Sequence, residues 1–332
     1  MKKRVLVLDP VDQAGTSLLN RDDIECVHLP FPSDDEIRSE LAQADALVLR
    51  AREIPKEWYL EAKKLQLISR HGVGCDNLDL NFLDSIGIGV AIAADANAVS
   101  VAEHTMMLML SVSRATIKYD QSVRNDAWAF RDSMVAQDLY QRSLVIVGFG
   151  RIGQHVAARA HAFGMQISIY DPALPSDVTL PEYVSRVESI EQAVSIADIL
   201  SLHLPRTVKT ENLFSKELLS QVKPGCLIVN AARGGIVNES DLIEKLDDKT
   251  VIGYATDVFN IEPPAPKDPL FSRDDVTLSP HSAAMTVQGS RRMATRSCQN
   301  VLDFFDGKLT QDMIVVNPSP EKKRNETLTP CT

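Results

Sequence analysis

The segment SLVIVGFGRIGQHVAARAHAF, residues 143–163, constrains the fold of this chain more than any other feature. A β-branched run leads directly into glycines at positions 148, 150 and 153, and a run of good helix formers follows. Glycines at this spacing allow a tight turn, a close approach to the backbone and close packing of a helix on a strand. The segment therefore predicts a strand, a turn and a helix, which is the beginning of a βαβ unit.

Short apolar runs alternate with helical patterns along most of the chain. In the first part we expect buried parallel strands at 4–9, 25–29, 46–50, 65–70 and 89–93. A second series is expected at 143–150, 166–171, 199–204, 227–232, 251–258 and 276–280. The alternation predicts an α/β chain with two doubly wound parallel-sheet domains. The apolar segment 100–113 predicts a helix buried within the protein or against another subunit.

Composition and charge argue against several classes of protein. The 332 residues are 44% hydrophobic, and the net charge of −10 would repel nucleic acid and anionic membranes, so neither is expected as a partner. The first apolar run ends at Asp9, too early for a signal peptide, and no stretch is long enough to span a membrane. The five cysteines are widely spaced and form no CxxC pair, which favours a reduced, cytoplasmic protein.

The glycine-rich turn predicts a dinucleotide site. Its backbone amides and the dipole of the following helix favour a pyrophosphate. The next strand ends at Asp171, which can accept hydrogen bonds from the adenosine ribose and would repel the extra phosphate of NADP, so NAD is the expected cofactor. The alternative is a glycine turn that binds nothing, with Asp171 only capping the loop before Pro172. No metal is expected, because His71, His104 and His203 are too scattered to share one.

Reactive side chains follow three strands of the second series. Arg233 comes after 227–232, Asp257 and Glu262 come at and after the end of 251–258, and His281 comes after 276–280. Ligands of doubly wound sheets bind at the carboxyl ends of the strands. Oxidation of a hydroxy acid needs a cation for its carboxylate, which Arg233 can supply, and a base, which His281 can supply with Glu262 orienting its ring. Each residue alone can equally be a surface or loop residue, but their shared location favours a catalytic set.

Several motifs, in order, resemble those of the D-isomer-specific 2-hydroxyacid dehydrogenase family over nearly the whole chain. They are RHGVGCDNLDL, SVAEHTMMLML, VGFGRIG with YDP, SLHLP, NAARGGIVNESDL, ATDVFNIEPP and SPHSAAMT. The resemblance implies hydride transfer between NAD and C2 of a D-2-hydroxy acid, with Arg233, Glu262 and His281 as the catalytic set. It also places the backbone of Val73 and Gly74 at the substrate carboxylate. The expected cofactor-binding residues are Gly148, Gly150, Arg151, Ile152, Gly153, Asp171, Leu204, Pro205, Ala231, Ala232 and Asp257, the last near the nicotinamide carboxamide.

The resemblance also implies a discontinuous domain organisation. A Rossmann NAD-binding domain at 99–283 is expected to be inserted in a flavodoxin-like substrate domain formed by 1–98 and 284–317. The polar residues 318–332 are expected to form a disordered tail. Members of the family are usually homodimers joined through the region around residues 100–140, so a homodimer is expected here.

Within the family, the motifs look most similar to those of short 3-phosphoglycerate dehydrogenases without a regulatory domain. Arg50 and Arg52 lie at a strand end, where they can hold a distal phosphate or be ordinary surface charges. Hydroxypyruvate and glyoxylate reductases share the architecture, and the C-terminal-binding-protein corepressors bind NAD(H) but act by docking peptides. Formate dehydrogenases of this fold carry glutamine at the position of Glu262, so the acidic residue argues against that activity.

Overall fold

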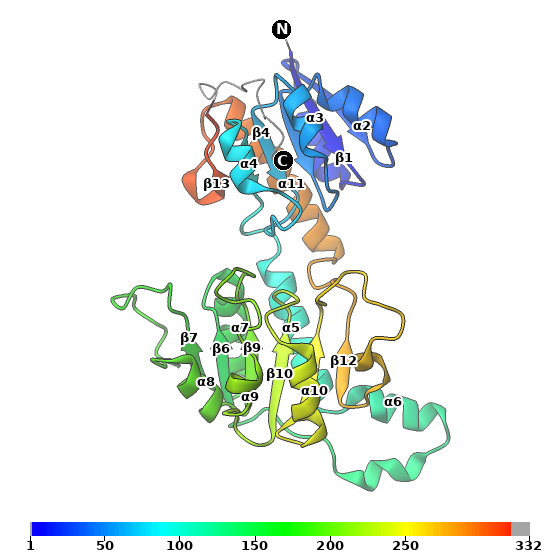
Figure 1. Cartoon of the computed structure of the whole chain (residues 1–332), viewed down its shortest axis with the longest axis vertical. Coiled ribbons are helices and arrows are strands. Elements are labelled where there is room, and N and C mark those ends of the chain that lie inside the picture. The colour runs from blue at the N-terminus through cyan, green and yellow to red at the C-terminus, as the bar shows by residue number, and fades with distance from the viewer. Residues whose placement is uncertain (1, 320–332) are drawn as a thin grey trace, which may run out of the picture. The chain divides into compact units, whose positions relative to one another are not determined.

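The computed structural model describes residues 2–319, and the chain divides into two compact units. Unit 1 consists of Met1–Asn97 and Met285–Thr332, and unit 2 is Ala98–Ala284. Of the tail predicted at 318–332, all but the first two residues lie outside the described residues. Figure 1 shows the helices and strands of each unit.

Unit 1 is built on a six-stranded sheet in the order β13-β5-β4-β3-β1-β2. The first five strands along the chain are parallel, and β13 pairs antiparallel with β5. The order β2-β1-β3-β4-β5 is that of flavodoxin-like folds, as predicted. The bounds are Lys3–Leu8 for β1, Ile24–Leu29 for β2, Ala46–Leu49 for β3, Leu67–Arg70 for β4, Gly89–Ile92 for β5 and Ile314–Val316 for β13.

Helices cover both faces of this sheet. On one face, α11 packs its apolar side, which includes Ala294, Cys298 and Val301, over strands β3, β4 and β5. On the other face, α2 and α3 bury Ile37, Leu41 and Tyr59. Because both faces are covered, an interior strand such as β3 is apolar throughout rather than alternating, whereas the edge strand β2 carries the exposed Glu25. The helices are α1 Gln13–Thr16, α2 Asp34–Leu41, α3 Lys56–Glu61, α4 Leu80–Ser85 and α11 Val287–Phe305, with 3₁₀ turns at η1 Ser17–Leu19 and η4 Gln311–Met313.

Unit 2 contains a seven-stranded parallel sheet in the order β12-β11-β10-β9-β6-β7-β8. Counted from β6, this is the Rossmann strand order with a seventh strand at one edge, which confirms the predicted fold class. The strand order reverses between β6 and β9, where ligands of such sheets bind. The bounds are Ser143–Val147 for β6, Gln166–Tyr170 for β7, Val184–Arg186 for β8, Ile199–Leu202 for β9, Cys226–Asn230 for β10, Val251–Thr256 for β11 and Val276–Leu278 for β12.

Alternate residues of these strands face two different apolar layers. Leu144 and Ile146 of β6 pack with α5 and α7, whereas Val145 and Val147 pack with α8, α9 and α10. The predicted apolar helix is α5, and it contacts α7 and strands β10 and β11. The helices are α5 Ala98–Ser113, α6 Thr116–Arg124, α7 Arg151–Ala162, α8 Ile190–Ile196, α9 Lys216–Leu219 and α10 Glu239–Asp247, with 3₁₀ turns at η2 Trp128–Ser133 and η3 Pro269–Ser272.

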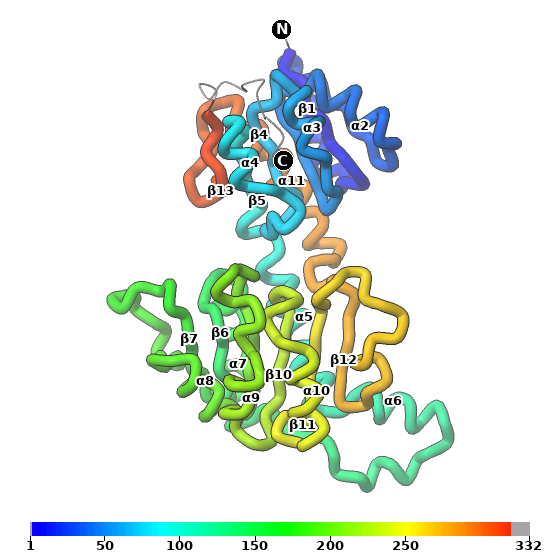
Figure 2. Tube along the Cα trace, viewed as in Figure 1, coloured from blue at the N-terminus to red at the C-terminus, as the bar shows by residue number. Residues whose placement is uncertain are grey.

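The connection from α5 to β6 leaves several large apolar side chains exposed. Neither α6 nor η2, which it contains, has a buried residue. Figure 2 traces this connection away from the sheet of unit 2. Its exposed apolar side chains include those of Ile117, Val123, Trp128 and Met134.

Candidate active site

The glycine-rich turn between β6 and α7 requires glycine for a different reason at each position. Gly148 has φ of +98°, and a Cβ there would lie 2.6 Å from the carbonyl oxygen of His203. A Cβ on Gly153 would lie 2.3 Å from the carbonyl oxygen of Gly148. At Gly150, by contrast, a Cβ would meet no atom within 4 Å. The first and third glycines therefore serve the turn and the packing of α7, while the second leaves open space beside the backbone.

That open space and the first turn of α7 fit the pyrophosphate of a dinucleotide. Gly150 is the N-cap of α7 and offers no side chain to satisfy the first amides of the helix. Anions are stabilised at such a terminus by amide donors and by the helix dipole. Arg151 and Ile152 form the first turn, and the predicted residues after β9 and β10 lie at the same carboxyl edge of the sheet: Leu204, Pro205, Ala231 and Ala232.

Asp171, at the end of β7, holds the glycine-rich turn from the side. Its Oδ2 accepts a hydrogen bond from the amide of Phe149 at 2.8 Å, and its Oδ1 accepts one from the amide of Ala173 at 2.9 Å. The bond to the amide of Ala173 caps the loop around Pro172, which is the role that the alternative interpretation of Asp171 predicted. Each carboxylate oxygen has two acceptor sites, so the same side chain can cap its loop, order the turn and still accept hydrogen bonds from a ribose.

His281 and Glu262 form a hydrogen-bonded pair at the carboxyl end of the sheet. His281 Nδ1 lies 2.5 Å from Glu262 Oε2, and Glu262 Oε1 accepts the amide of Phe259 at 3.0 Å. Both carboxylate oxygens are therefore used to fix the carboxylate, and the carboxylate orients the ring. The His281 side chain remains 50% exposed and that of Glu262 35% exposed, so the pair is accessible to a ligand.

Contact between the two side chains raises the pKa of His281 and lowers the pKa of Glu262, and both shifts favour the charged forms. The hydrogen bond from Glu262 raises the pKa of His281, against the opposing effects of burial and of the positive charge on Arg233. Burial alone would raise the pKa of Glu262, but the hydrogen bonds from His281 and from the Phe259 amide outweigh it, so that pKa is lowered. The imidazole is thereby favoured in its protonated form, as a proton donor at neutral pH requires.

Arg233 lies beside this pair, at the end of the neighbouring strand β10. Its backbone carbonyl accepts a hydrogen bond from Asn230 Nδ2 at 3.0 Å, and its guanidinium donates to the carbonyl of Ala232 at 2.7 Å. Its charge acts on the pKa of His281, so the two side chains share one electrostatic environment. All three predicted catalytic residues thus lie in unit 2, with His281 and Glu262 in contact and Arg233 near enough for its charge to act on the pKa of His281.

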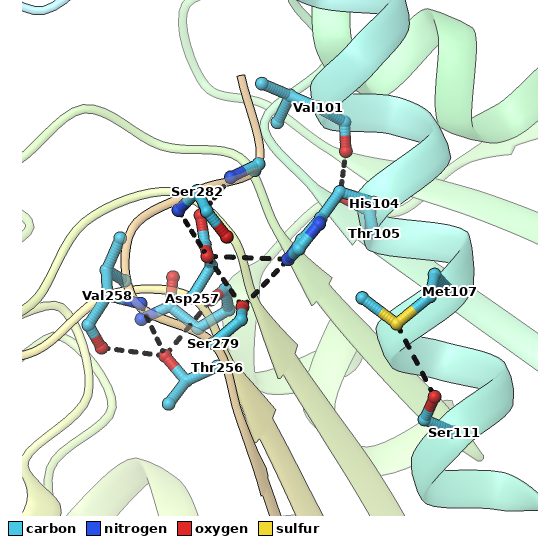
Figure 3. A network of polar contacts seen from close by, with 12 residues as sticks. Val101, His104, Thr105, Met107, Ser111, Thr256, Asp257, Val258, Ser279 and Ser282 are labelled. Carbon is cyan, nitrogen blue, oxygen red and sulfur yellow. Dashed lines mark hydrogen bonds and ion pairs between the residues drawn. The ribbon is translucent and has the colours of Figure 1, made fainter. Parts of the chain in front are cut away.

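Asp257 is a buried hub beneath the same edge, with 1% of its side chain exposed (Figure 3). Its Oδ1 accepts hydrogen bonds from Ser279 Oγ at 2.6 Å and from the amide of Ser282 at 2.8 Å, and its Oδ2 accepts the amide of Ala283 at 2.8 Å. Burial would raise its pKa, but the hydrogen bonds from His104, Ser279 and the two amides outweigh burial and lower it. Asp257 is therefore a buried carboxylate stabilised by a full set of donors.

A cavity of about 540 Å³ adjoins the pair of His281 and Glu262. Its walls are mainly apolar, and His281 and Glu262 are its ionisable groups. A wall of this kind lowers the local dielectric constant and strengthens electrostatic interactions at the pair. The lining residues are Phe259, Glu262, Pro263, Pro264, Phe271, Leu278, Ser279, Pro280 and His281.

Four of the five residues predicted to bind substrate belong to unit 1, and the fifth is Arg233 of unit 2. Val73 and Gly74 lie in the loop after β4, and Asn77 of that loop donates hydrogen bonds to the carbonyls of Arg50 and Arg52 at 3.3 and 2.9 Å. The Arg52 guanidinium is paired with Asp9, with its Nη2 3.0 Å from Oδ1, whereas Arg50 donates to a backbone carbonyl. A carbonyl does not cancel a charge, so Arg50 is the stronger of the two candidates for a distal anion.

Comparison with known proteins decides the family. Residues 106–283 match the D-isomer specific 2-hydroxyacid dehydrogenase, NAD binding domain. The chain is also 35% identical to hydroxypyruvate reductase from Thermotoga maritima, covering 90% of this chain and 97% of that protein. The chain belongs to the D-isomer-specific 2-hydroxyacid dehydrogenase family. The resemblance predicted from the motifs is confirmed, as is the prediction of NAD as the cofactor.

Further members of this 2-hydroxyacid dehydrogenase family differ in length and in named activity. The chain is 35% identical to D-3-phosphoglycerate dehydrogenase 2, chloroplastic, from Arabidopsis thaliana over 93% of its own length, but it spans only 49% of that relative. Among solved structures it resembles NAD-dependent formate dehydrogenase from Staphylococcus aureus in complex with NAD, with a TM-score of 0.82, 27% identity and coverage of 95% of this chain and 100% of that one.

Two polar residues of this dehydrogenase site were missed by the sequence analysis. His104 was considered only as a metal ligand, and Ser279 was not considered at all, yet both join the Asp257 hub. A histidine inside a largely apolar helix is the signal that could have indicated His104. Within residues 2–319, no group of three His, Cys, Asp or Glu side chains is arranged to hold a metal, and no helix is long and apolar enough to cross a membrane.

Proposed function

We propose that this chain is an NAD-dependent oxidoreductase that transfers a hydride between nicotinamide and C2 of a D-2-hydroxy acid or its 2-keto acid. The observation that carries the proposal is the 2.5 Å pair between His281 Nδ1 and Glu262 Oε2 beside Arg233. Because Nδ1 is held by the carboxylate, Nε2 is the atom that exchanges a proton with substrate. Such an orientation of a histidine by a carboxylate is typical of general acid–base catalysis.

Each residue of the set has a distinct role in the proposed reaction. Arg233 binds the substrate carboxylate through its planar guanidinium. In oxidation His281 accepts the proton of the C2 hydroxyl at Nε2, and in reduction it returns that proton to the carbonyl oxygen. Glu262 keeps the imidazolium stable enough to donate, because it raises the pKa of His281. NAD, when bound at the glycine-rich turn, supplies the acceptor or the donor of the hydride.

For the cofactor, we propose that unit 2 is the NAD-binding domain and unit 1 the substrate domain. The cofactor-binding residues would be those of the glycine-rich turn, Asp171 and the residues after β9 and β10. Asp171 supports NAD over NADP because its charge opposes a ribose phosphate. The buried Asp257 is proposed to lie near the nicotinamide carboxamide.

For the substrate, we propose a 2-keto acid with a distal anion, such as the one derived from 3-phosphoglycerate. The curated D-3-phosphoglycerate dehydrogenases and the positive charge of Arg50 in unit 1 support this class. The second candidate is reduction of hydroxypyruvate or glyoxylate, which is supported by the hydroxypyruvate reductase whose length this chain nearly spans. Loss of discrimination between phosphohydroxypyruvate and hydroxypyruvate in Arg50→Ala or Arg52→Ala would favour the first. Unchanged KM values in both variants would exclude it.

We also propose a cytoplasmic homodimer. The exposed apolar side chains of Ile117, Val123, Trp128 and Met134 support the dimer, because four large apolar side chains exposed within one connection favour a surface that a partner covers. Sedimentation of the purified chain tests this, and a monomer at micromolar concentration would contradict it.

The activity is tested by mixing the protein with NADH and a panel of keto acids, namely phosphohydroxypyruvate, hydroxypyruvate, glyoxylate and sulfopyruvate, and following nicotinamide absorbance. A separate reaction of the protein with NAD and formate tests whether this chain oxidises formate, as the formate dehydrogenase among its structural relatives does by name. Turnover should fall by about 10²- to 10⁴-fold in His281→Ala. His161→Ala is the matched control, because that ring stacks on Tyr183 at the far end of α7.

The outcomes separate the alternatives. Keto acid reduction that depends on His281 supports the proposed dehydrogenase. Tight NADH binding without turnover of any substrate would instead favour a corepressor-like sensor of NAD(H). Failure to bind NADH would refute the proposal for the whole site.

A further inference from the structure

His104 is one of only two ionisable residues in α5, and the two have different environments. Glu103 is 63% exposed and pairs with Arg159. The side chain of His104 is 17% exposed and points from the helix toward the ends of β11 and β12 (Figure 3). Val101 and Leu108, one turn away on either side, are buried apolar residues. A polar ring in this position needs a hydrogen-bond partner to offset its burial.

The hydrogen bonds fix which atom of His104 carries a proton. The Asp257 carboxylate can only accept, so Ser279 Oγ donates its single hydrogen to Oδ1 at 2.6 Å. Ser279 Oγ then has only lone pairs left for His104 Nε2, which lies 2.8 Å away. His104 must therefore donate from Nε2. The same nitrogen lies 3.4 Å from Asp257 Oδ1, so the ring supports the carboxylate both through the serine and by its proximity.

The carboxylate in turn holds the loop that carries His281. Asp257 accepts the amides of Ser282 and Ala283 through its side chain, and its backbone carbonyl accepts the amide of His281 at 2.8 Å. His281 itself has φ of +49°, in the left-handed region. A residue with a Cβ keeps this conformation only where its surroundings over-determine it. Here the conformation of His281 is fixed by the hydrogen bonds that Asp257 accepts from Ser279 on one side and from Ser282 and Ala283 on the other.

We propose that His104 is a positioning residue of the active site, which acts through Ser279 and Asp257 to hold the 279–283 loop so that His281 meets Glu262. The proposal deepens the proposed function and rests on it, because it assigns a further residue to the same catalytic pair. His104 itself does not touch the reacting atoms. It supplies one directed N–H donor to Ser279 Oγ, whose hydroxyl in turn donates to the buried carboxylate of Asp257, and the loop is ordered as a consequence.

The proposal is tested with variants that separate the donor from the ring. His104→Leu removes the donor and keeps apolar bulk, while His104→Gln places an amide N–H near the position of Nε2. Ser279→Ala removes the intermediate hydroxyl, and Glu103→Gln is the control on the outer side of the same helix. Should His104→Leu fail to fold, His104→Asn replaces it, because its shorter amide does not reach Ser279.

Three measurements are made on the full chain: kcat and KM for the keto acid, the Kd for NADH by fluorescence, and the titration of the His281 ring by NMR, assigned with His281→Ala. His104→Leu and Ser279→Ala should each lower kcat by about tenfold with KM changed far less, as expected for loss of a hydrogen bond to a charged group. The pKa of His281 should fall as its ring separates from Glu262, while Asp257 and Arg233 remain its other charged neighbours. His104→Gln should keep most of the wild-type kcat. The double variant of His104→Leu with Ser279→Ala should have a kcat no lower than that of either single variant.

Wild-type kcat and wild-type His281 titration in His104→Leu would overturn the proposal. The proposal would also be overturned if the losses of kcat in the two single variants multiplied in the double variant, or if His104→Gln had a kcat as low as that of His104→Leu. The NMR titration does not depend on turnover. If the wild-type protein reduces no keto acid, the proposed function fails, whereas a shifted His281 titration in His104→Leu would still support the positioning role.

Discussion

Replacement of the buried hub, Asp257→Asn, tests the electrostatic organisation of the site most directly. Asparagine has almost the same shape but only one side-chain oxygen and no charge. In the wild type, Oδ1 receives Ser279 Oγ and the Ser282 amide, and Oδ2 receives the Ala283 amide. With the remaining oxygen in the Oδ1 position, the new NH₂ group faces the Ala283 amide, and two donors are left opposed.

The cost follows from these contacts. Hydrogen bonds to a charged group contribute about 1.5–3 kcal/mol each, and a buried donor without an acceptor costs about 1–3 kcal/mol. One such bond is lost outright and two are weakened, so we expect a local loss of about 2–4 kcal/mol. Solvent does not screen these hydrogen bonds, so the expected free-energy loss is not reduced, because the Asp257 side chain is only 1% exposed. We expect protection of the Ser282 and Ala283 amides from hydrogen exchange to fall by about thirtyfold or more.

Hydrogen exchange followed by mass spectrometry is the appropriate assay, because two units need not unfold together. A peptide covering 276–284 reports on the loop, and one covering β4 serves as the internal reference in unit 1. The matched control is Asp120→Asn, in which an exposed carboxylate paired with Arg124 is lost and no measurable change in the protection of the 276–284 peptide is expected.

The pH dependence provides a second check on the charge. Because the pKa of Asp257 is lowered in the fold, the carboxylate contributes its full stability above its ordinary pKa near 4. That contribution is lost as pH falls through the lowered value. The difference between wild type and Asp257→Asn should thus be constant at neutral pH and should shrink in acid. Equal protection of the two proteins at pH 7 would refute this account, as would a difference that persists undiminished in acid.

Four further substitutions test other parts of the site. Glu262→Gln should lower the pKa of His281, so that reduction, which needs the protonated ring, declines at a lower pH than in wild type; an unmoved alkaline limb in the kcat profile would contradict this. Asp171→Ala should weaken NAD binding by about tenfold or more and narrow the preference over NADP, as fluorescence titration with both cofactors would show. Gly150→Ala has open space and should leave unit 2 stable while weakening NAD, whereas Gly153→Ala, whose Cβ would lie 2.3 Å from a carbonyl oxygen, should destabilise unit 2 itself in calorimetry.

The long parallel strands could be predicted from sequence because both faces of each sheet are covered, which makes interior strands such as β3 and β10 buried along their whole length and rich in apolar residues. Two strands were missed. β8 and β13 have three residues each and lie at sheet edges, so they carry little periodicity. The pairing of β13 with β5 joins Ile314 to Ala91, and no local pattern contains that contact.

The candidate site was predictable where residues follow strands, and less so where it depends on tertiary pairing. Arg233, Glu262 and His281 each come shortly after a strand of unit 2, so position alone indicated them. The bond between His104 and Ser279 spans 175 positions and leaves no trace in spacing. Asp9 neutralises the charge of Arg52 because the two residues follow β1 and β3, which are neighbours in the sheet. It could have been inferred from the strand order that the resemblance implied.

The interrupted course of unit 1 along the chain has a consequence for synthesis on the ribosome. Strands β1 to β5 emerge first, but the helix that covers one face of their sheet, α11, is encoded after the whole of unit 2. At about 5–20 residues per second, translation of the intervening segment takes about 10–40 s. Throughout that interval Ser69 and the carbonyl of Ile92 lack their partners on α11, the backbone of Ser297 and the side chain of Asn300. Unit 2, by contrast, is contiguous and can fold as it emerges, so the nascent chain carries a finished domain beside an uncovered apolar sheet that a chaperone would have to shield.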